Sequence, residues 1–224
     1  MTTLSEGAAG NRLQRRKQRT RAALVKAAQR LIAEGKVNVP VLEITQAADV
    51  GMGSFYNHFD SKEQLFEAAV ADVLDAHGAL LDRLTASIED PAETFATSFR
   101  LTGRLFRQRP VESEILLATG PALLTSERGL APRALRDIKG AADAGRFHNA
   151  VKDDPELALA MAGGALLGLG TLLRQDPERN GALAADTVTE NLLRLFGLPA
   201  DEARAICQHP LPDLDTWEQP DSAA

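Results

Sequence analysis

The sequence predicts an all-α protein. Aromatic residues make up 4% of the 224 residues, with one tyrosine and one tryptophan, while alanine and leucine, which favour helices, supply most of the apolar residues. No segment shows the alternation of apolar and polar residues that is typical of strands. The hydrophobic and charged fractions, 44% and 25%, are those of a folded globular chain, and the length suits one large domain or two small ones.

The first helix is predicted from Leu13 onward, because apolar residues recur at helical spacing as far as Ile32. Gly35 follows and is expected to end this helix in the left-handed conformation. Residues 1–12 have the composition of a disordered tail and lack the apolar run of a signal peptide, which predicts a cytoplasmic protein.

Two short helices and one long helix are expected next. Residues 41–48 start after Pro40, which suits a helix start, and residues 52–58 place Phe55 and Phe59 on one side. The turn between the two short helices is Asp49-Val50-Gly51. Ser61 to Gln64 fit the S-x-x-Q capping box and predict the start of a long helix.

The rest of the chain is predicted to be helical, with prolines and glycines between the helices. The expected helices cover 92–108, 111–118, 127–145, 155–174 and 183–196, with a shorter one at 200–207. The longest uncharged run, 157–173, is shorter than a membrane span and contains four glycines, so a buried helix is favoured over a transmembrane one. Residues 209–224 have the composition of a loosely attached tail.

Charge divides the chain into two parts. Residues 1–62 hold ten Lys and Arg against five acids, a net charge of +5, whereas residues 63–224 hold 15 against 26, a net charge of −11. The overall charge of −6 would argue against a nucleic-acid partner, but this asymmetry indicates a basic end that faces one. The single cysteine, Cys207, excludes an intrachain disulfide and a cysteine-based zinc site.

Two short helices joined by a tight turn after a longer helix form a helix-turn-helix, whose second helix enters the major groove of DNA. The residues Ile44-Thr-Gln-Ala-Ala-Asp-Val-Gly-Met-Gly-Ser-Phe-Tyr-Asn-His-Phe59, followed by Ser61-Lys-Glu-Gln-Leu65, resemble the DNA-binding region of the tetracycline-repressor (TetR) family of transcriptional regulators. This resemblance covers about residues 20–66. It implies an N-terminal three-helix domain, 13–62, ahead of a larger helical ligand-binding and dimerisation domain, 63–208.

The candidate DNA-binding residues lie in residues 12–21, a basic arm at the start of the first helix, and around the third helix. They are Arg15, Arg16, Lys17, Arg21, Gly51, Met52, Gly53, Ser54, Tyr56, Asn57, His58 and Lys62. The two glycines allow the backbone to approach the groove closely, while Met52 and Ser54 offer contacts to a thymine methyl group. The arm suits the phosphates or a minor groove, although a solvated helix start has the same composition.

Three of these residues have an alternative interpretation. Tyr56 suits a phosphate contact, with a core tyrosine as the alternative. Lys62 suits a phosphate in the first turn of the long helix, with an ordinary surface lysine as the alternative. His58 suits a phosphate contact and a packing role equally well.

The chain departs from the family pattern at several positions. Asp49 stands where glycine is usual, Gly51 where a capping Ser or Thr is usual, and Pro40 where Thr is common. Asp tolerates the left-handed conformation and Gly is a fair N-cap, so the motif is expected to form. Leu42 occupies a position that in some relatives carries an arginine that reads a base.

The acidic remainder is expected to bind a ligand and to form a homodimer. Small residues at 160, 164 and 168 allow close helix packing, within the chain or between chains, and the resemblance implies a dimer through 155–174 and 183–196. The candidate interface residues are Ala160, Gly164, Gly168, Leu172, Leu192 and Leu195. The candidate ligand residues are Phe95, Phe99, Arg104, Phe106, Ile115, Leu116 and His148, with Leu123 and Leu124 beside them, although most of them are more typical of a plain core.

No enzyme is predicted. The four histidines are scattered, and no H-E-x-x-H, G-x-S-x-G or G-x-G-x-x-G motif occurs, so no catalytic residue, metal or cofactor is expected. The preferred hypothesis is a ligand-responsive repressor that binds double-stranded operator DNA and is released by a small-molecule effector that the sequence does not identify. The alternative is a helical ligand-binding or scaffold protein whose helix-turn-helix does not read DNA.

Overall fold

The computed structural model describes the backbone of residues 3–148 and 150–212 and the side chains of residues 14–148 and 151–212. Within these ranges every regular element is a helix, as the sequence predicts. The chain divides into an N-terminal unit that ends at Asp72 and a C-terminal unit that begins at Val73, with the boundary inside α4 (Lys62–Thr85). The sequence had placed this boundary at the start of that helix.

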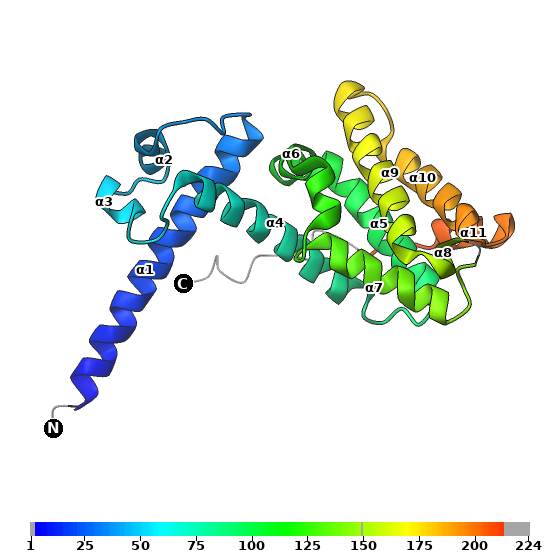
Figure 1. Cartoon of the computed structure of the whole chain (residues 1–224), viewed down its shortest axis with the longest axis horizontal. Helices are drawn as coiled ribbons and strands as arrows, with labels where there is room; N and C mark the ends of the chain where they lie inside the picture. The colour runs from blue at the N-terminus through cyan, green and yellow to red at the C-terminus, as the bar shows by residue number, and fades with distance from the viewer. Residues whose placement is uncertain (1–2, 149, 213–224) are drawn as a thin grey trace. The chain divides into compact units, whose positions relative to one another are not determined.

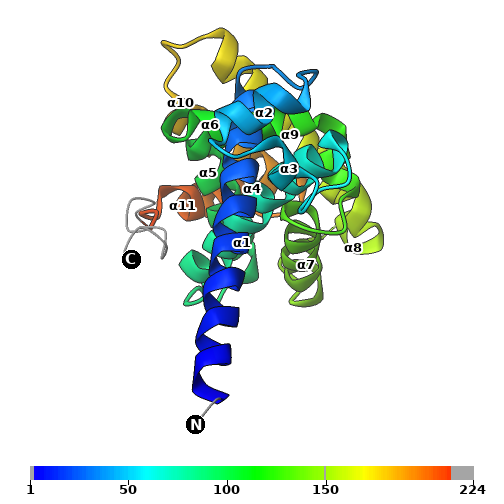
Figure 2. The same ribbon diagram turned by 90° about the vertical axis from the view of Figure 1, so that its left-hand side faces the viewer.

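The N-terminal unit contains α1 (Thr3–Ala33), α2 (Val41–Ala47), α3 (Met52–Phe55) and the first part of α4. Both views show α2 and α3 beside the C-terminal half of α1 (Figures 1 and 2). The core is formed by Leu24, Ala28, Ile44, Phe55 and Leu65, each with no exposed surface. The helix α1 begins at Thr3, so its backbone includes most of the segment 1–12 that was expected to be a tail.

Both turns of this unit are closed by residues in the left-handed conformation. Gly35, at φ 71°, ends α1 while the N–H of Lys36 donates to the carbonyl oxygen of Leu31 at 2.8 Å. Asp49, at φ 54°, plays the same role after α2, and the N–H of Val50 donates to the carbonyl oxygen of Thr45 at 3.0 Å. These bonds satisfy carbonyls that a helix end leaves free. Both residues therefore adopt the conformation that the sequence predicts.

The helix α3 is shorter than the predicted 52–58, because it ends at Phe55 and the chain continues in turns. The N–H groups of His58 and Phe59 both donate to the carbonyl oxygen of Phe55, at 2.9 and 3.0 Å. At the start of α4, the N–H of Gln64 donates to Oγ of Ser61 at 3.2 Å, as the capping box predicts. The Gln64 side chain accepts instead from the N–H of Asp60, at 2.7 Å.

The C-terminal unit is a helical bundle around α5. Its elements are α5 (Pro91–Gln108), α6 (Pro110–Thr119), the 3-10 helix η1 (Gly120–Thr125), α7 (Leu130–Asp143), α8 (Ala150–Asp153), α9 (Pro155–Gln175), α10 (Gly181–Leu195) and α11 (Ala200–Gln208). The helix α5 packs against α6, α7, α9, α10 and α11. The sequence predicted the long helices but neither η1 nor α8, each of which has only enough residues for one or two turns.

Polar side chains cap three of these helices. Asp90, Asp154 and Asn180 accept hydrogen bonds from backbone N–H groups in the first turns of α5, α9 and α10, at 2.9, 3.0 and 3.0 Å. Each satisfies a donor that the helix start would otherwise leave free. This explains why the helices begin at the Asp-Pro pairs and at Asn180-Gly181.

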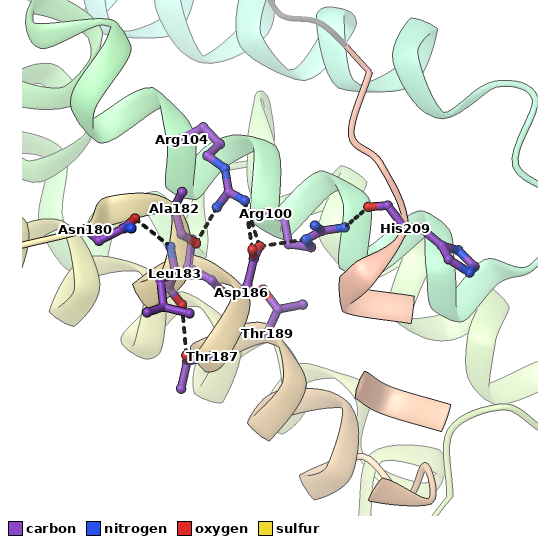
Figure 3. A network of polar contacts seen from close by, with 10 residues as sticks. Arg100, Arg104, Asn180, Ala182, Leu183, Asp186, Thr187, Thr189 and His209 are labelled. Carbon is purple, nitrogen blue, oxygen red and sulfur yellow. Dashed lines mark hydrogen bonds and ion pairs between the residues drawn. The ribbon is translucent and has the colours of Figure 1, made fainter. Parts of the chain in front are cut away.

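A buried arginine network fastens α10 and the C-terminal segment to α5 (Figure 3). Arg100, with 5% of its side chain exposed, donates to Oδ1 of Asp186 at 2.8 Å and to the carbonyl oxygen of His209 at 3.0 Å. Arg104 donates to both carboxylate oxygens of Asp186, at 2.8 and 2.9 Å. Charge-assisted and bidentate bonds of this kind are stronger than neutral ones. They fix α10 against α5.

Cys207 lies on α11 and is buried, with 6% of its surface exposed. Burial raises the pKa of its thiol to about 11. The thiol is therefore protonated at neutral pH, which makes it unreactive.

Candidate nucleic-acid interface and ligand cavity

The cations of the basic arm are free to meet a ligand. Arg15, Arg16, Lys17 and Arg21 are all exposed on α1, and among the residues whose side chains are described none of them forms an ion pair with an acid. The guanidinium of Arg21 lies over the ring of Phe59, at 5.2 Å from its centroid. This contact places the C-terminal end of the arm beside the turn that follows α3.

His58 lies close to the same cations. It is half-buried, and desolvation lowers its pKa, together with the nearby positive charges of Lys17 and Arg21. The imidazole is therefore neutral at pH 7, because the free side chain already titrates near pH 6.5. A neutral imidazole still has one N–H to donate to a phosphate oxygen.

Tyr56 is exposed to 61%, which excludes the alternative of a core tyrosine. Its ring meets the ring of Phe55 edge-on, with the centroids 5.1 Å apart. Packing on a fully buried neighbour holds the phenol in place while most of it faces solvent. Lys62, half-buried in the first turn of α4, follows a few residues later.

The candidate base-reading residues surround α3. Gly51, Met52, Gly53 and Asn57 are exposed, and Ser54 is half-buried with its N–H bonded to the carbonyl oxygen of Gly51 at 2.8 Å. A Cβ added at Gly53 would meet no atom within 4 Å, and one at Gly51 would meet only Oγ of Ser54 at 3.9 Å. The face around these two glycines is therefore open.

Sequence reasoning missed two side chains that hold this unit together. Arg30, expected only as one of the cations, donates to the carbonyl oxygen of Ala47 at 2.9 Å and so caps the C-terminal end of α2. Gln29 donates to the carboxylate of Asp72 at 2.9 Å and thereby joins α1 to α4. Both residues follow the helical spacing of α1, but their partners are distant in sequence, and periodicity carries no signal for such pairs.

A cavity lies in the C-terminal unit between α4, α5, η1, α7 and α9. Its walls are mostly apolar: Leu81, Phe95, Phe99, Leu123, Leu124, Leu130, Ala131, Ala134, Leu159, Ala162, Gly163 and Leu166. Five polar side chains complete the lining: Asp82, Ser98, Thr102, Arg133 and Asp137. An apolar pocket with a few convergent polar groups is the usual form of a small-molecule site.

The polar side of the cavity is an ion-pair network. Asp82 accepts from Arg133 and from Arg136, both at 2.8 Å, and Asp137 accepts from Arg136 at 2.8 Å. Desolvation raises the pKa of Asp82, but hydrogen bonds from the two arginines outweigh it and leave the pKa lowered. Burial raises the pKa of Asp137, whose side chain is 9% exposed. The two carboxyl groups thus differ in proton affinity.

Gly78 makes room for this network. A Cβ at Gly78 would lie 2.7 Å from Nη1 of Arg133, so any larger residue would have to displace the guanidinium. The position on α4 is one turn before Asp82, the carboxylate that Arg133 reaches.

The seven predicted ligand residues do not come together. Phe95 and Phe99 line the cavity. Phe106, Ile115 and Leu116 are buried elsewhere in the core, at 8%, 0% and 0% exposure. Arg104 is engaged by Asp186, and His148 is exposed in the loop after α7, with its N–H bonded to the carbonyl oxygen of Phe196 at 2.8 Å.

The polar lining was missed because Asp82 and Arg133 look like surface charges in the sequence. They are 51 residues apart, and only packing of α4 against α7 brings them together. The carboxylate and guanidinium belong to ordinary amphipathic helices, so the pattern of charges gives no separate signal for the cavity.

The outer faces of α9 and α10 carry exposed small and apolar residues. Ala160, Gly164 and Gly168 are exposed, Leu172 is 41% exposed and Leu195 is 54% exposed. A Cβ at Gly164 or Gly168 would meet nothing within 4 Å. Leu192, in contrast, is 6% exposed and packs in the core of its own chain, because it faces inward from α10.

In the described residues, α9 is the one helix whose length and hydropathy would allow it to cross a membrane. Its inward face is used within the fold, since Ala158, Leu166, Leu169 and Leu173 are buried there. The uncharged run is shorter than a membrane span, but the helix around it is 21 residues long, so length alone does not distinguish the two interpretations and the buried inward face favours a core helix.

A helix-turn-helix on a basic first helix, followed by a helical unit that contains an apolar cavity with polar groups on one side, is typical of DNA-binding regulators that respond to small molecules. Residues 24–69 match the family model of bacterial regulatory proteins of the tetR family, and residues 90–209 match the tetracyclin repressor-like C-terminal domain. No match was found among curated protein sequences.

Two solved structures resemble the chain over most of its length. RolR in complex with its ligand resorcinol is 32% identical, covers 89% of this chain and 98% of its own, and gives a TM-score of 0.68. SmeT, the repressor of the Stenotrophomonas maltophilia multidrug efflux pump SmeDEF, is 20% identical. It covers 86% of this chain and 97% of its own, and gives a TM-score of 0.68. The chain belongs to the tetR family of bacterial transcriptional regulators.

Proposed function

We propose that this protein is a homodimeric repressor that leaves its operator DNA when a small hydroxylated aromatic compound binds in the cavity. The observation that carries the proposal is the lining itself, which combines the rings of Phe95 and Phe99 with the Asp82, Arg133 and Asp137 side chains. This combination of aromatic and polar side chains supports an effector that carries both an aromatic ring and hydroxyl groups.

The two sides of the cavity match two parts of such a compound. An aromatic ring is favoured against phenylalanine and leucine side chains, because it buries apolar area and makes ring contacts. Hydroxyl groups can donate to the carboxyl groups of Asp82 and Asp137 and accept from Arg133. RolR, whose structure contains resorcinol, a dihydroxybenzene, supports this class of effector.

On the DNA side, the exposed cations of α1 and the residues around α3 and α4 form the proposed interface. Arg15, Arg16, Lys17, Arg21, Tyr56, His58 and Lys62 are assigned to phosphates, and Gly51, Met52, Gly53, Ser54 and Asn57 to the bases. Phosphate contacts supply affinity and register, whereas contacts to base edges supply specificity. The cytoplasm is the proposed location, because operator DNA is found there.

The exposed face of α9 and α10 supports the proposed homodimer. Ala160, Gly164, Gly168, Leu172 and Leu195 leave an apolar surface with room for close helix packing. A two-fold pair of helix-turn-helix units also matches the symmetry of operators, in which two half-sites lie about one helical turn apart. Leu192 is not part of the proposed interface, since it is buried in its own chain.

Fluorescence anisotropy with the DNA upstream of the protein's own gene tests the repressor. We expect binding that exceeds binding to a random duplex of equal length, and equal binding to both at low salt would overturn the proposal. Adding resorcinol should release the specific complex, whereas its dimethyl ether, which has no hydroxyl to donate, should not. Release by both compounds would exclude recognition through the carboxyl groups.

The Asp137→Asn variant tests effector binding separately from DNA binding. It removes the charge but keeps the shape, so the variant should bind DNA as the wild type does and need at least tenfold more resorcinol for release. Isothermal titration calorimetry without DNA provides the direct measurement. Unchanged resorcinol affinity would place the effector elsewhere.

A further inference from the structure

The segment that forms the helix-turn-helix carries no cation of its own. Between Lys36 and Lys62 the sequence contains neither lysine nor arginine. The commonest specific contact to a base pair is Arg or Lys to guanine in the major groove. This chain therefore cannot read guanine in that way from α2, α3 or the turns beside them.

Large apolar side chains are exposed in the same segment. Leu42 on α2 is 50% exposed and Met52 on α3 is 46% exposed. The opposite face of α2 is buried through Ile44 and Thr45, at 0% and 1%. Leu42 therefore lies on the face of α2 that the fold does not use, and neither residue contributes a full side chain to the core.

The charges around these two residues point to DNA as the partner. Lys17 and Arg21 lie close to His58, Arg21 lies over the ring of Phe59, and Lys62 opens α4, so cations flank the segment of the two apolar residues on both sides in sequence. Cations at the edge suit phosphates, and apolar side chains between them suit the floor of the groove. Since Gly51 and Gly53 are open, the backbone can approach closely.

We propose that Leu42 and Met52 read thymine, by contact of their side chains with the C5 methyl groups that thymine presents in the major groove. The methyl group is the apolar feature that distinguishes thymine there. The exposed amides of Gln46 and Asn57 belong to the residue types that pair with adenine, so they favour the same A·T pairs. Each operator half-site thus contains thymines opposite α2 and α3, and the inference rests on the proposed DNA-binding function.

Replacing thymine by deoxyuridine tests the contact directly, because this change removes only the methyl group and keeps base pairing. The purified full-length protein first selects duplexes from a randomised pool, and the selected duplex is then substituted one thymine at a time. We expect a loss of affinity of about fourfold at each contacted thymine, the fold-change that corresponds to ~0.8 kcal/mol for one buried methyl-sized group.

Variants assign each methyl group to a side chain. In Met52→Ala and Leu42→Ala, the deoxyuridine penalty should disappear at one position each and remain at the others. Val37→Ala is the matched control, since Val37 is 45% exposed but lies outside both helices, and it should keep every penalty. Circular dichroism confirms that each variant is folded.

Two failures are distinguishable. If the protein enriches no sequence from the pool, the proposed DNA-binding function itself fails. If it enriches a sequence but deoxyuridine lowers the affinity at no position, or if the losses of affinity persist in both alanine variants, Leu42 and Met52 do not read thymine. The proposed DNA-binding function is then unaffected.

Discussion

Asp49 illustrates how a single residue sets the turn between α2 and α3. Its φ of 54° is the left-handed conformation that most side chains avoid, and the chain has no other described non-glycine residue with positive φ. Asp is one of the few side chains that adopt it at modest cost. The helix-turn-helix therefore keeps its geometry without the glycine that the family resemblance leads one to expect.

Lys62 should contribute one phosphate contact. Lys62→Ala is expected to weaken binding to all DNA sequences alike and to reduce the slope of log Kobs against log salt by about one. The measurement is anisotropy over a salt series. Lys36→Ala is the control, because Lys36 pairs with Glu34 at 2.8 Å outside the proposed interface, and its slope should equal that of the wild type. An unchanged slope for Lys62→Ala would remove it from the interface.

His77 makes the C-terminal unit sensitive to acid. It is 6% exposed on α4, its Nε2 lies 3.0 Å from Oγ1 of Thr102, and burial lowers its pKa to about 4. Thr102 donates to the carbonyl oxygen of Ser98, so the imidazole acts as the donor to Thr102.

Because the pKa of His77 is lower in the folded state than in the unfolded state, the unfolded chain takes up the proton first. The neutral His77 therefore contributes fully to the free energy of unfolding above about pH 6.5. This contribution is lost as the pH falls toward 4, and the free energy of unfolding is lower by about 2 kcal/mol at pH 5. Urea unfolding at pH 7 and pH 5 measures it. In His77→Gln the difference between the two pH values should shrink by about that amount, and an unchanged difference would refute the assignment.

At the scale of elements, the glycines of α9 have two different functions. A Cβ at Gly163 would collide with the side chain of Leu124 in η1, whereas one at Gly164 would meet nothing. Gly163 thus permits close approach within the chain, beside the cavity, and Gly164 contributes to the open face.

Gly163→Ala should therefore overpack the contact between α9 and η1 and lower the free energy of unfolding by about 1–3 kcal/mol. Gly140→Ala is the control, because Gly140 is exposed on α7 with nothing within 4 Å and alanine favours a helix, so it should stabilise by about 0.5–1 kcal/mol. Chemical denaturation measures both. Equal effects of the two changes would show that α9 does not pack closely on η1.

The sequence predicts elements better than it predicts contacts between them. Helix ends at Gly35, Asp90 and Asp154 follow from local chemistry, and local chemistry is visible in a single sequence. The cavity is not, because Asp82 meets Arg133 only through packing of α4 on α7. For the same reason Phe106 and Arg104, equally plausible in sequence, lie away from the cavity, while Phe95 and Phe99 line it.

At the scale of the whole molecule, the charge division now has a structural meaning. The cations of residues 1–62 include the exposed arm of α1, whereas many acids of the C-terminal unit are engaged with arginines, as Asp82, Asp90 and Asp186 are. The net charge of −6 is the sum of two parts with different functions. A negative remainder disfavours non-specific approach of that part to DNA.

Gly168→Leu should prevent dimerisation without unfolding the chain. The position is open in the monomer, so leucine fits there, but a bulky side chain would separate two chains that pack through α9. Analytical ultracentrifugation should show a monomer, and circular dichroism a folded one. Gly140→Leu, an equally open site on α7, should remain dimeric. A dimer of Gly168→Leu with wild-type stability would place the interface elsewhere.

The buried thiol of Cys207 has a practical consequence. Because it is protonated and shielded at neutral pH, a maleimide or nitroxide reagent will leave it unmodified under conditions that label an exposed thiol. A cysteine introduced at Asn57 would therefore be the single labelled site of each chain. In a dimer, the distance between the two labels would report the spacing of the two helix-turn-helix units as the effector is titrated.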